Sequence, residues 1–253
     1  MSGVDPFKLY MELQLSLPRN GPGSAEATRH VFGLLPPLPA KAEILDAGCG
    51  QAPEAFDLLP LTHARIIALD LFEPFLDKAY ERAEREEVPE ERLVFKHGDM
   101  EALPFGPESF DLIWSEGAIY LLGFERGLKL WRPFVKPGGH VVVSECSWLT
   151  EKPSPEVRHF WDEAYPGMGT AAANSAAARH AGYEVAATYV LPEEAWWKNY
   201  YTPMQRRIAE LAVEWTDPGD EALNVLREAG REIALFARYP AEYSYVFYVL
   251  KRL

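Results

Sequence analysis

Residues 44–54 read ILDAGCGQAPE, an apolar run that ends in two glycines and leads into a helix. Glycines at such a turn let a ligand approach the backbone closely, and the start of the next helix offers unpaired N–H groups. A dinucleotide-binding fingerprint needs glycine or alanine three residues after Gly50, where this chain has Pro53. Asp46 precedes the first glycine by two residues, and a carboxylate there repels a pyrophosphate and attracts a cation. The stretch therefore predicts a strand, a tight bend and a helix that bind a positively charged ligand.

Apolar runs and amphipathic stretches alternate from this bend onward. Residues 74–86 place Phe75, Leu76 and Ala79 at helical spacing, with charged residues on the other face. Residues 118–135 also predict a helix, which ends at the KPGG of residues 136–139 because proline cannot continue it. The alternation is typical of a doubly wound α/β fold, in which helices cover a parallel sheet. We expect strands at residues 44–47, 65–69, 93–96, 111–115, 140–144, 183–191 and 242–250.

Two segments outside this alternation predict helical additions. Residues 5–17 and 25–35 each predict a helix, and the LLPPLPA of residues 34–40 separates them from the core. Residues 192–239 carry two helical patterns, the first of which runs through Met204, Leu211 and Trp215. We expect an N-terminal helical cover over residues 1–40 and one domain over residues 41–253, with a helical lid inserted at about 192–239 before the last strand.

Composition limits the class of function. The 253 residues are 48% hydrophobic, so the chain can bury a core, and 25 basic against 38 acidic residues give a net charge of −13. This charge repels nucleic-acid phosphates and anionic lipids, so we expect no nucleic acid and no membrane as a partner. No long apolar run and no signal-peptide pattern occurs, which favours a cytoplasmic protein. Two cysteines and scattered histidines predict neither a disulfide framework nor a metal site.

The DAGCG of residues 46–50 resembles the first motif of class I S-adenosylmethionine-dependent methyltransferases, and the other marks of that superfamily follow in order. Asp70 ends the second run, Gly98-Asp99-Met100 follows the third, FDLIWSE at residues 110–116 is the fourth, and LWRPFVKPGG at residues 130–139 precedes the fifth. The resemblance implies a seven-stranded Rossmann-like sheet with an antiparallel last strand, and S-adenosyl-L-methionine as cofactor. It implies that Asp70 takes the ribose hydroxyls and Asp99 the adenine amino group. The implied cofactor contacts are Asp46, Gly48, Cys49, Gly50, Asp70, Leu71, Asp99, Met100 and Glu116.

One position departs from this motif. The family usually has a third glycine where this chain has Ala52, followed by Pro53. Alanine adds the bulk of one methyl group, and proline in the first turn of a helix loses only an N–H that has no partner there. We expect cofactor binding to persist.

Stretches beyond the core are similar to a bacterial subfamily of small-molecule methyltransferases whose substrate is unassigned. They are SEGAIY at residues 115–120, GFERG at 123–127, FW at 160–161, AYP at 164–166 and LP at 191–192, with Trp196 and the tyrosines at 200–201. This resemblance implies methyl transfer to a small-molecule acceptor by in-line displacement, in which the enzyme aligns nucleophile, methyl carbon and sulfur in a dry site. It leaves the acceptor open.

Two residues near the end of the fourth run are candidate catalytic groups. Glu116 either positions an amine or takes a proton from the nucleophile, or it caps a helix or orients the cofactor. Tyr120, one helical turn further, contacts either the methionine end of the cofactor or the acceptor. Arg19, in the loop after the first predicted helix, holds the methionine carboxylate or caps a helix.

The densest aromatic cluster of the chain comprises Trp196, Trp197, Tyr200 and Tyr201. As a lid, these rings would bind a cationic or planar acceptor through their faces. As structure, they would be the core of the inserted helices. We favour the lid and substrate contacts, because four aromatic residues so close in sequence cannot all face one way on a helix.

Three other functions fit parts of the pattern. A NAD-dependent dehydrogenase would also use an acid at Asp70, but Pro53 and Asp46 argue against it. A protein of the same fold that binds the cofactor without catalysis is compatible with the altered Ala52-Pro53. A nucleic-acid methyltransferase is disfavoured by the charge and by WSEG at residues 114–117, which stands in place of the Asn/Asp-Pro-Pro-aromatic motif.

Overall fold

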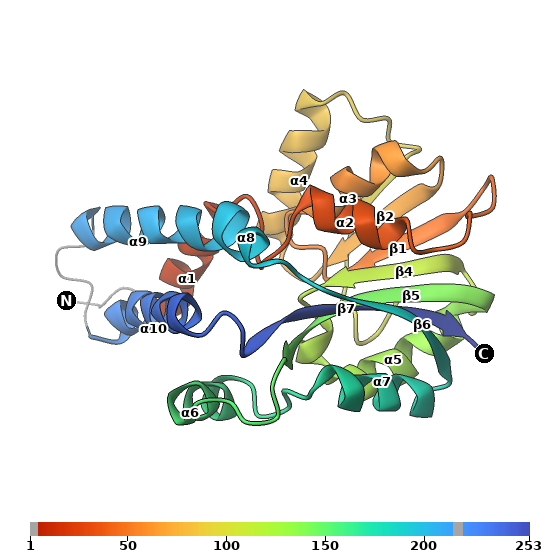
Figure 1. Ribbon diagram of the computed structural model, residues 1–253. Coiled ribbons are helices and arrows are strands. Elements are labelled where there is room, and N and C mark those ends of the chain that lie inside the picture. The colour runs from red at the N-terminus through yellow and green to blue at the C-terminus, as the bar shows by residue number, and fades with distance from the viewer. Residues whose placement is uncertain (1–4, 215–219) are drawn as a thin grey trace.

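The computed structural model describes residues 5–214 and 220–253, and its centre is a seven-stranded sheet with the strand order β3-β2-β1-β4-β5-β7-β6 (Figure 1). The strands β1 to β5 pair in parallel, whereas β7 runs antiparallel to both of its neighbours. The predicted doubly wound α/β fold with an antiparallel last strand is therefore confirmed. The strands are β1 Glu43–Ala47, β2 Arg65–Asp70, β3 Leu93–His97, β4 Phe110–Glu116, β5 Val135–Trp148, β6 Tyr183–Val190 and β7 Tyr243–Arg252.

Neighbouring residues of the inner strands point to opposite faces of the sheet, and this alternation divides the core in two. Ile44 packs in the cluster under helices α2 (Ala25–Phe32), α3 (Pro53–Leu58) and α4 (Glu73–Arg85). Leu45 packs in the cluster under α5 (Phe124–Trp131) and α7 (Ala171–His180). Figure 1 shows these two groups of helices on opposite sides of the sheet. Because both faces are buried, the inner strands are continuous apolar runs, which is why the sequence located them.

The single helix predicted over residues 118–135 is wrong. This segment folds as a short 3-10 turn at Ile119–Leu121, the helix α5, and a second 3-10 turn at Arg132–Phe134. Gly123 has a φ of 78° and interrupts the helical backbone before α5. The chain then folds back closely, because a Cβ on Gly127 would lie 2.7 Å from the side chain of Ile119.

Of the two N-terminal helices, α2 covers the sheet beside α3, whereas α1 (Pro6–Leu15) lies with the inserted helices beyond the edge where the parallel strands end (Figure 1). Helix α1 contacts α9 (Thr202–Glu214) and α10 (Asp220–Arg238), although they are far apart in sequence. A short helix, α8 (Glu193–Trp196), and a π-helical turn (Trp197–Tyr201) lead into α9, and α6 (Pro155–Ala164) lies after β5. Trp215, which the first helical pattern included, lies outside the described residues. None of the helices in the described ranges is long and apolar enough to cross a membrane.

Candidate functional site

Two cavities lie side by side where the parallel strands end. The first has a volume of about 380 Å³ and is lined by the loops that follow β1, β2, β3 and β4. The second has a volume of about 510 Å³ and lies between α1, α6, α10 and β7. Tyr10, Gly117 and the loop at residues 20–22 line both cavities, so the two meet there. Open α/β sheets bind their ligands at the carboxyl ends of the strands, which makes this pair of cavities the candidate site.

The glycine bend after β1 forms one wall of the first cavity. Gly48 and Gly50 have φ values of 71° and 54°, a region that favours glycine. A Cβ on Gly50 would also lie 2.6 Å from Oδ1 of Asn20, and one on Gly48 would lie 2.7 Å from Cβ of Ala118. The bend therefore requires glycine at both positions for space as well as for conformation. Between them lies Cys49, whose thiol pKa is raised well above its ordinary value by burial, so it is a small neutral group.

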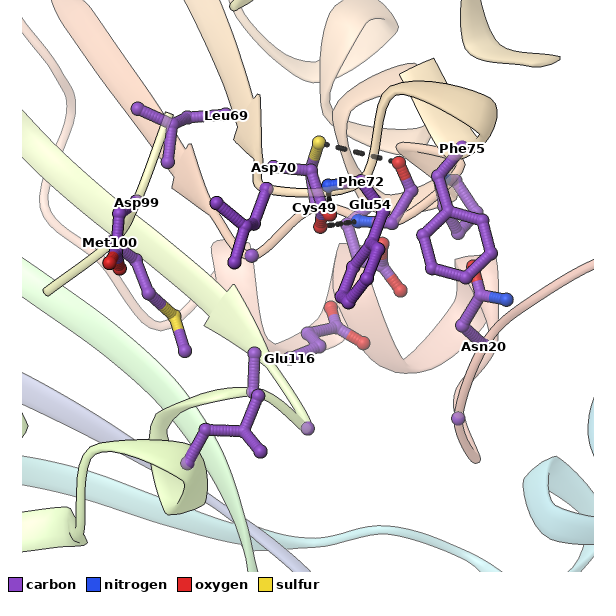
Figure 2. A pocket seen from close by; sticks show the side chains of 18 of the residues that line it. Asn20, Cys49, Glu54, Leu69, Asp70, Phe72, Phe75, Asp99, Met100 and Glu116 are labelled. Carbon is purple, nitrogen blue, oxygen red and sulfur yellow. Dashed lines mark hydrogen bonds between the residues drawn. The ribbon is translucent and has the colours of Figure 1, made fainter. Parts of the chain in front are cut away.

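Asp70 ends β2 and faces the first cavity beside this bend (Figure 2). Its Oδ2 accepts a hydrogen bond of 2.7 Å from the backbone N–H of Gly50, and its Oδ1 accepts one of 2.9 Å from that of Phe72. These bonds fix the plane of the carboxylate, and each oxygen retains a further lone pair. Burial raises the pKa of Asp70, while the two backbone hydrogen bonds act in the opposite direction. A carboxylate held in this way can accept both hydroxyls of a cis diol.

The loop after β3 forms another wall of the first cavity. Asp99 and Met100 line it, and Figure 2 shows them across the cavity from Glu54. The backbone carbonyl of Met100 accepts a hydrogen bond of 2.8 Å from the indole of Trp131 in α5, and Oδ1 of Asp99 accepts one of 2.7 Å from the N–H of Glu101. These contacts hold the loop against the sheet, so the position of Asp99 is set by the fold.

Glu116 ends β4 and lines the first cavity, but it is absent from the wall of the second. Its Oε1 accepts hydrogen bonds of 2.9 Å from both the hydroxyl of Thr28 and the indole of Trp114. Its Oε2 lies 3.7 Å from the guanidinium of Arg19 and has no hydrogen-bond partner among the described residues. Burial, with a smaller effect of the nearby Glu54, raises the pKa of Glu116 to about 8. This placement favours a role toward the cofactor over a role toward the acceptor.

In this structure Arg19 has neither of the two roles that were predicted for it. Its guanidinium is 5% exposed and is absent from the lining of the first cavity. It donates a hydrogen bond of 2.7 Å to Glu54 and pairs with Asp57, both on α3, while also lying close to Glu116. A buried cation among several carboxylates compensates charges that would otherwise be costly in a low dielectric. Arg19 therefore ties the N-terminal segment to α3 and to the end of β4.

Asp46 lies behind the wall of the first cavity, where it makes no part of its surface. It is 1% exposed, and its Oδ2 has no hydrogen-bond partner within residues 5–214 and 220–253. Burial, together with the charges of Glu54 and Glu116, raises the pKa of Asp46 well above its ordinary value. Glu54 and Glu116 line the cavity and Asp46 does not, so these two carboxyl groups are the ones placed to face a cationic ligand. The predicted direct contact of Asp46 with the cofactor has no support in this geometry.

The predicted aromatic lid divides between cavity and core. Trp196 and Tyr200 line the second cavity, whereas Trp197 and Tyr201 line neither cavity. The indole of Trp197 donates to Glu193, and Tyr201 is fully buried with its hydroxyl 2.7 Å from a carboxylate oxygen of α10. The rings form two pairs four residues apart, and residues at this spacing share one face of a helix, which sorts the four rings into two sets. For Trp197 and Tyr201 the geometry favours the core alternative over the predicted substrate contact.

Tyr120 lines the second cavity, where its ring packs edge-on against that of Tyr165 at 5.6 Å. Burial raises the pKa of Tyr120 to about 12, so the phenol keeps its proton near neutral pH. It can donate a hydrogen bond to a ligand but is poorly suited as a base. Leu71, another predicted contact, lines the first cavity.

Sequence reasoning missed several residues of the site. Asn20 closes the glycine bend, with its Oδ1 3.3 Å from the N–H of Gln51, and Tyr10 separates the two cavities. The Asn-Gly-Pro-Gly run at residues 20–23 was the available signal for a turn at this place. Glu54 directly follows Pro53, so the predicted start of the helix could have indicated Glu54 as a residue of the site. No local pattern indicated that Tyr10 faces a cavity, because its place depends on how α1 packs.

Comparison with known proteins agrees with this arrangement. Residues 44–139 match the model of a methyltransferase domain. The chain is 38% identical over 105 residues to erythromycin 3''-O-methyltransferase of Saccharopolyspora erythraea, a stretch that covers 41% of this chain and 34% of that protein. The chain therefore spans about a third of the length of this curated relative.

Solved structures share the fold over nearly the whole chain. YjhP from E. coli superposes with a TM-score of 0.82 at 20% identity, covering 97% of this chain and all of the other. A S-adenosylmethionine-dependent methyltransferase from Geobacter sulfurreducens, solved with S-adenosyl-L-homocysteine, superposes with a TM-score of 0.81 at 17% identity, covering both chains fully. The resemblance to class I methyltransferases, whose cofactor is S-adenosyl-L-methionine, is confirmed, and the residues of the site stay predictions.

Proposed function

We propose that this protein, whose residues 44–139 form a class I S-adenosylmethionine-dependent methyltransferase domain, transfers the methyl group of S-adenosyl-L-methionine to a small-molecule acceptor. One observation carries the proposal. The cavity that contains the glycine bend and Asp70 shares wall residues, Gly117 among them, with a second, largely aromatic cavity beside it. A methyl donor and an acceptor placed in these two cavities would meet at that shared wall.

The first cavity fits the cofactor chemically. Asp70 would accept the two ribose hydroxyls and Asp99 the adenine amino group, because both carboxylates face the cavity from strand ends. Glu54 and Glu116 line the same cavity and would face the methionine ammonium group. The other proposed contacts are Gly48, Cys49, Gly50, Leu71 and Met100.

The chain contributes alignment and exclusion of water. When bound, S-adenosyl-L-methionine supplies an electrophilic methyl group on a sulfonium, and no nucleophilic side chain is needed. Helix α1 and the loop at residues 20–22 cover the meeting point of the cavities through Tyr10, Asn20 and Pro22. Covering the reacting atoms keeps the site dry and limits the approach of the acceptor to one direction. Tyr120 would donate a hydrogen bond to the acceptor in the second cavity.

Two further observations, the name of a relative and the net charge, bear on the class of the acceptor. The curated relative is named for methylation of erythromycin, which supports a small-molecule acceptor here as well. The net charge of −13 argues against nucleic acid as the acceptor and against binding to anionic membranes. The cytoplasmic location expected from the sequence stays a prediction.

Titration calorimetry with S-adenosyl-L-methionine and S-adenosyl-L-homocysteine tests the cofactor site. We expect both to bind, and we expect Asp70→Ala to weaken binding by about 1–3 kcal/mol, because two charge-assisted hydrogen bonds are lost. The matched control is Asp77→Ala, which removes one exposed carboxylate from α4 and should leave the affinity unchanged. Equal affinity of wild type and Asp70→Ala would contradict this site.

Turnover separates the remaining alternatives. We expect release of S-adenosyl-L-homocysteine when the protein and cofactor meet a pooled metabolite extract. Tight cofactor binding without any release would identify a cofactor-binding protein that lacks catalysis. A change of nicotinamide fluorescence on mixing with NADH, in the absence of methyl transfer, would identify a dehydrogenase instead.

A further inference from the structure

The second cavity has an unusual chemical lining. Its walls carry many aromatic rings and two carboxylates, on Glu228 and Glu232 of α10, and its one cysteine, Cys146, has a thiol pKa raised well above its ordinary value by burial. Among the described residues, no lysine, arginine or histidine lines this cavity. The aromatic rings are those of Tyr10, Tyr120, Phe160, Trp161, Tyr165, Trp196, Tyr200 and Tyr245.

Glu232 is the charged group that this lining leaves uncompensated. Its carboxylate accepts a hydrogen bond of 2.7 Å from the hydroxyl of Tyr201, and it forms no ion pair with any residue that the structure describes. Glu228, by contrast, is exposed and pairs with Arg231 at 3.5 Å. A carboxylate in an apolar, enclosed place is costly unless a cation compensates it. The described residues thus provide the carboxylate of Glu232 but no cation that pairs with it.

The electrostatic effect of Glu232 extends across the cavity. Its negative charge contributes to raising the pKa of Tyr10, Tyr120 and Tyr200, which lie on three separate elements of the wall. On the β5 side, Glu145 lies behind Tyr165, is 2% exposed, and has an Oε1 with no hydrogen-bond partner in the described part of the chain. Burial raises the pKa of Glu232, and it raises that of Glu145 to about 7. A bound cation stabilises the ionised form of both carboxyl groups and an anion destabilises it, so the cavity favours cationic ligands over anionic ones.

We propose that the second cavity binds an amine as its ammonium ion, with the carboxylate of Glu232 as counter-ion and the aromatic walls around the remaining surface of the cation. Before methyl transfer the ammonium group gives one proton to the carboxylate of Glu232, which frees the nitrogen lone pair that attacks the methyl carbon. This inference rests on the proposed function, because it assigns the chemical class of the acceptor. Aromatic faces attract cations, and most strongly where water is excluded, so both parts of the wall select the same ligand. An alcohol of the same shape would gain neither the ion pair nor the cation–π attraction.

Calorimetry on the full chain, saturated with S-adenosyl-L-homocysteine, tests the proposal. The probes are benzylamine, phenethylamine and tyramine, each compared with the alcohol and the carboxylate of the same carbon skeleton. We expect wild type to bind at least one amine about tenfold or more tightly than its alcohol, and to bind no carboxylate. Equal affinity for an amine and its alcohol, preference for a carboxylate, or no heat from any probe would overturn the proposal.

Two variants make the test specific to Glu232. Glu232→Gln keeps an oxygen for the hydroxyl of Tyr201 but removes the charge, so we expect it to lose the preference for amines. Because it removes an uncompensated buried charge, we expect its melting temperature without amine to be equal to or above that of wild type, whereas a purely structural role would lower it. Glu163→Gln, an exposed change of the same charge on α6, should behave as wild type.

The cofactor titration distinguishes the two possible failures. Binding of S-adenosyl-L-homocysteine together with no preference for amines would overturn the acceptor class and leave the proposed function in place. Absence of cofactor binding would overturn the proposed function itself. Retention of the amine preference in Glu232→Gln would show that another group holds the cation.

Discussion

The two cavities share a wall but are built in different ways. The first is formed by backbone turns and short side chains that directly follow four parallel strands, and Asp70, Asp99 and Glu116 each stand at or just after a strand end. The second is formed by large side chains of α1, α6, α10 and β7, which come from distant parts of the chain. The first cavity is thus shaped by strand positions, whereas the second is shaped by how helices pack.

Residues of the N-terminal segment line both cavities. Charged contacts attach one part of the segment to the rest of the molecule, and apolar contacts attach the other part. Arg19 fixes the segment beside the first cavity through charges on α3, whereas Leu9 and Leu13 of α1 are buried in the apolar core that includes the inserted helices. Charged contacts are sensitive to pH, and apolar contacts are not. Substitutions can therefore disturb one cavity and spare the other.

The largest effect should come from Arg19→Met, which leaves the buried Glu54 and Asp57 without their cation. Breaking a buried ion pair on one side typically costs about 3–5 kcal/mol, and we expect a loss of this size in the free energy of unfolding at neutral pH. Urea unfolding measures it. The loss should shrink as the pH falls, because a protonated carboxyl group needs no counter-ion.

Arg65→Met is the matched control for this prediction. Arg65 pairs with Glu43 at 3.5 Å, and both side chains are partly exposed, so we expect a loss below about 1 kcal/mol. Equal losses in the two variants would mean that Arg19 acts as a surface residue. Amine binding in the second cavity should survive Arg19→Met better than cofactor binding does, if the two attachments are independent.

The fold and the first cavity could largely be predicted because their signals are local. A strand buried on both faces is a continuous apolar run, and Asp70 and Asp99 follow such runs directly, so their place needs no knowledge of packing. The prediction over residues 118–135 was wrong because helical spacing continues across Gly123, while its positive φ is visible only in the structure. Asp46 was predicted to contact the cofactor, but its burial behind the wall of the cavity could not be predicted from its spacing alone.

The second cavity could not be predicted for the opposite reason. Glu232 and Tyr10 lie on amphipathic helices whose patterns indicate a buried face without indicating what lies beneath it. Trp196 and Tyr200 share one helix face, and Trp197 and Tyr201 share another, but the spacing does not indicate which of the two faces meets the cavity. These positions follow from tertiary packing between segments that lie far apart in the sequence.

The pH dependence of stability tests the contrast between the two cavities, because Glu116 lines only the first of them. Burial raises the pKa of Glu116 from 4.5 to about 8 in the folded protein. The folded state holds the extra proton between these values, so the stability that this group contributes is full below the lower pKa and is lost as the pH rises to the upper one. Relative to Glu116→Gln, wild type should lose up to about 1.4 kcal/mol per pH unit in this window.

Urea unfolding of both proteins at several pH values across the window measures this difference. Cofactor affinity should rise with pH over the same range, because the methionine ammonium group favours the ionised carboxylate. A difference between the two proteins that stays constant with pH would contradict the placement of Glu116 in a dry wall of the first cavity. Amine binding to the second cavity should not follow Glu116, which lines only the first.

The smallest effect should come from Ala52→Gly, at the one position where the glycine bend departs from its family. Ala52 is fully buried and has a φ of 58°, a left-handed conformation that costs a side chain about 1–2 kcal/mol. Glycine removes this strain but adds about 0.5–1 kcal/mol of conformational entropy to the unfolded chain, so we expect a gain in stability of at most about 1.5 kcal/mol. Thermal unfolding detects such a gain, and cofactor affinity should rise or stay equal. A loss of stability would mean that the methyl group of Ala52 packs well enough to offset its strain, and the bend would then be shaped by its core contacts as much as by its backbone.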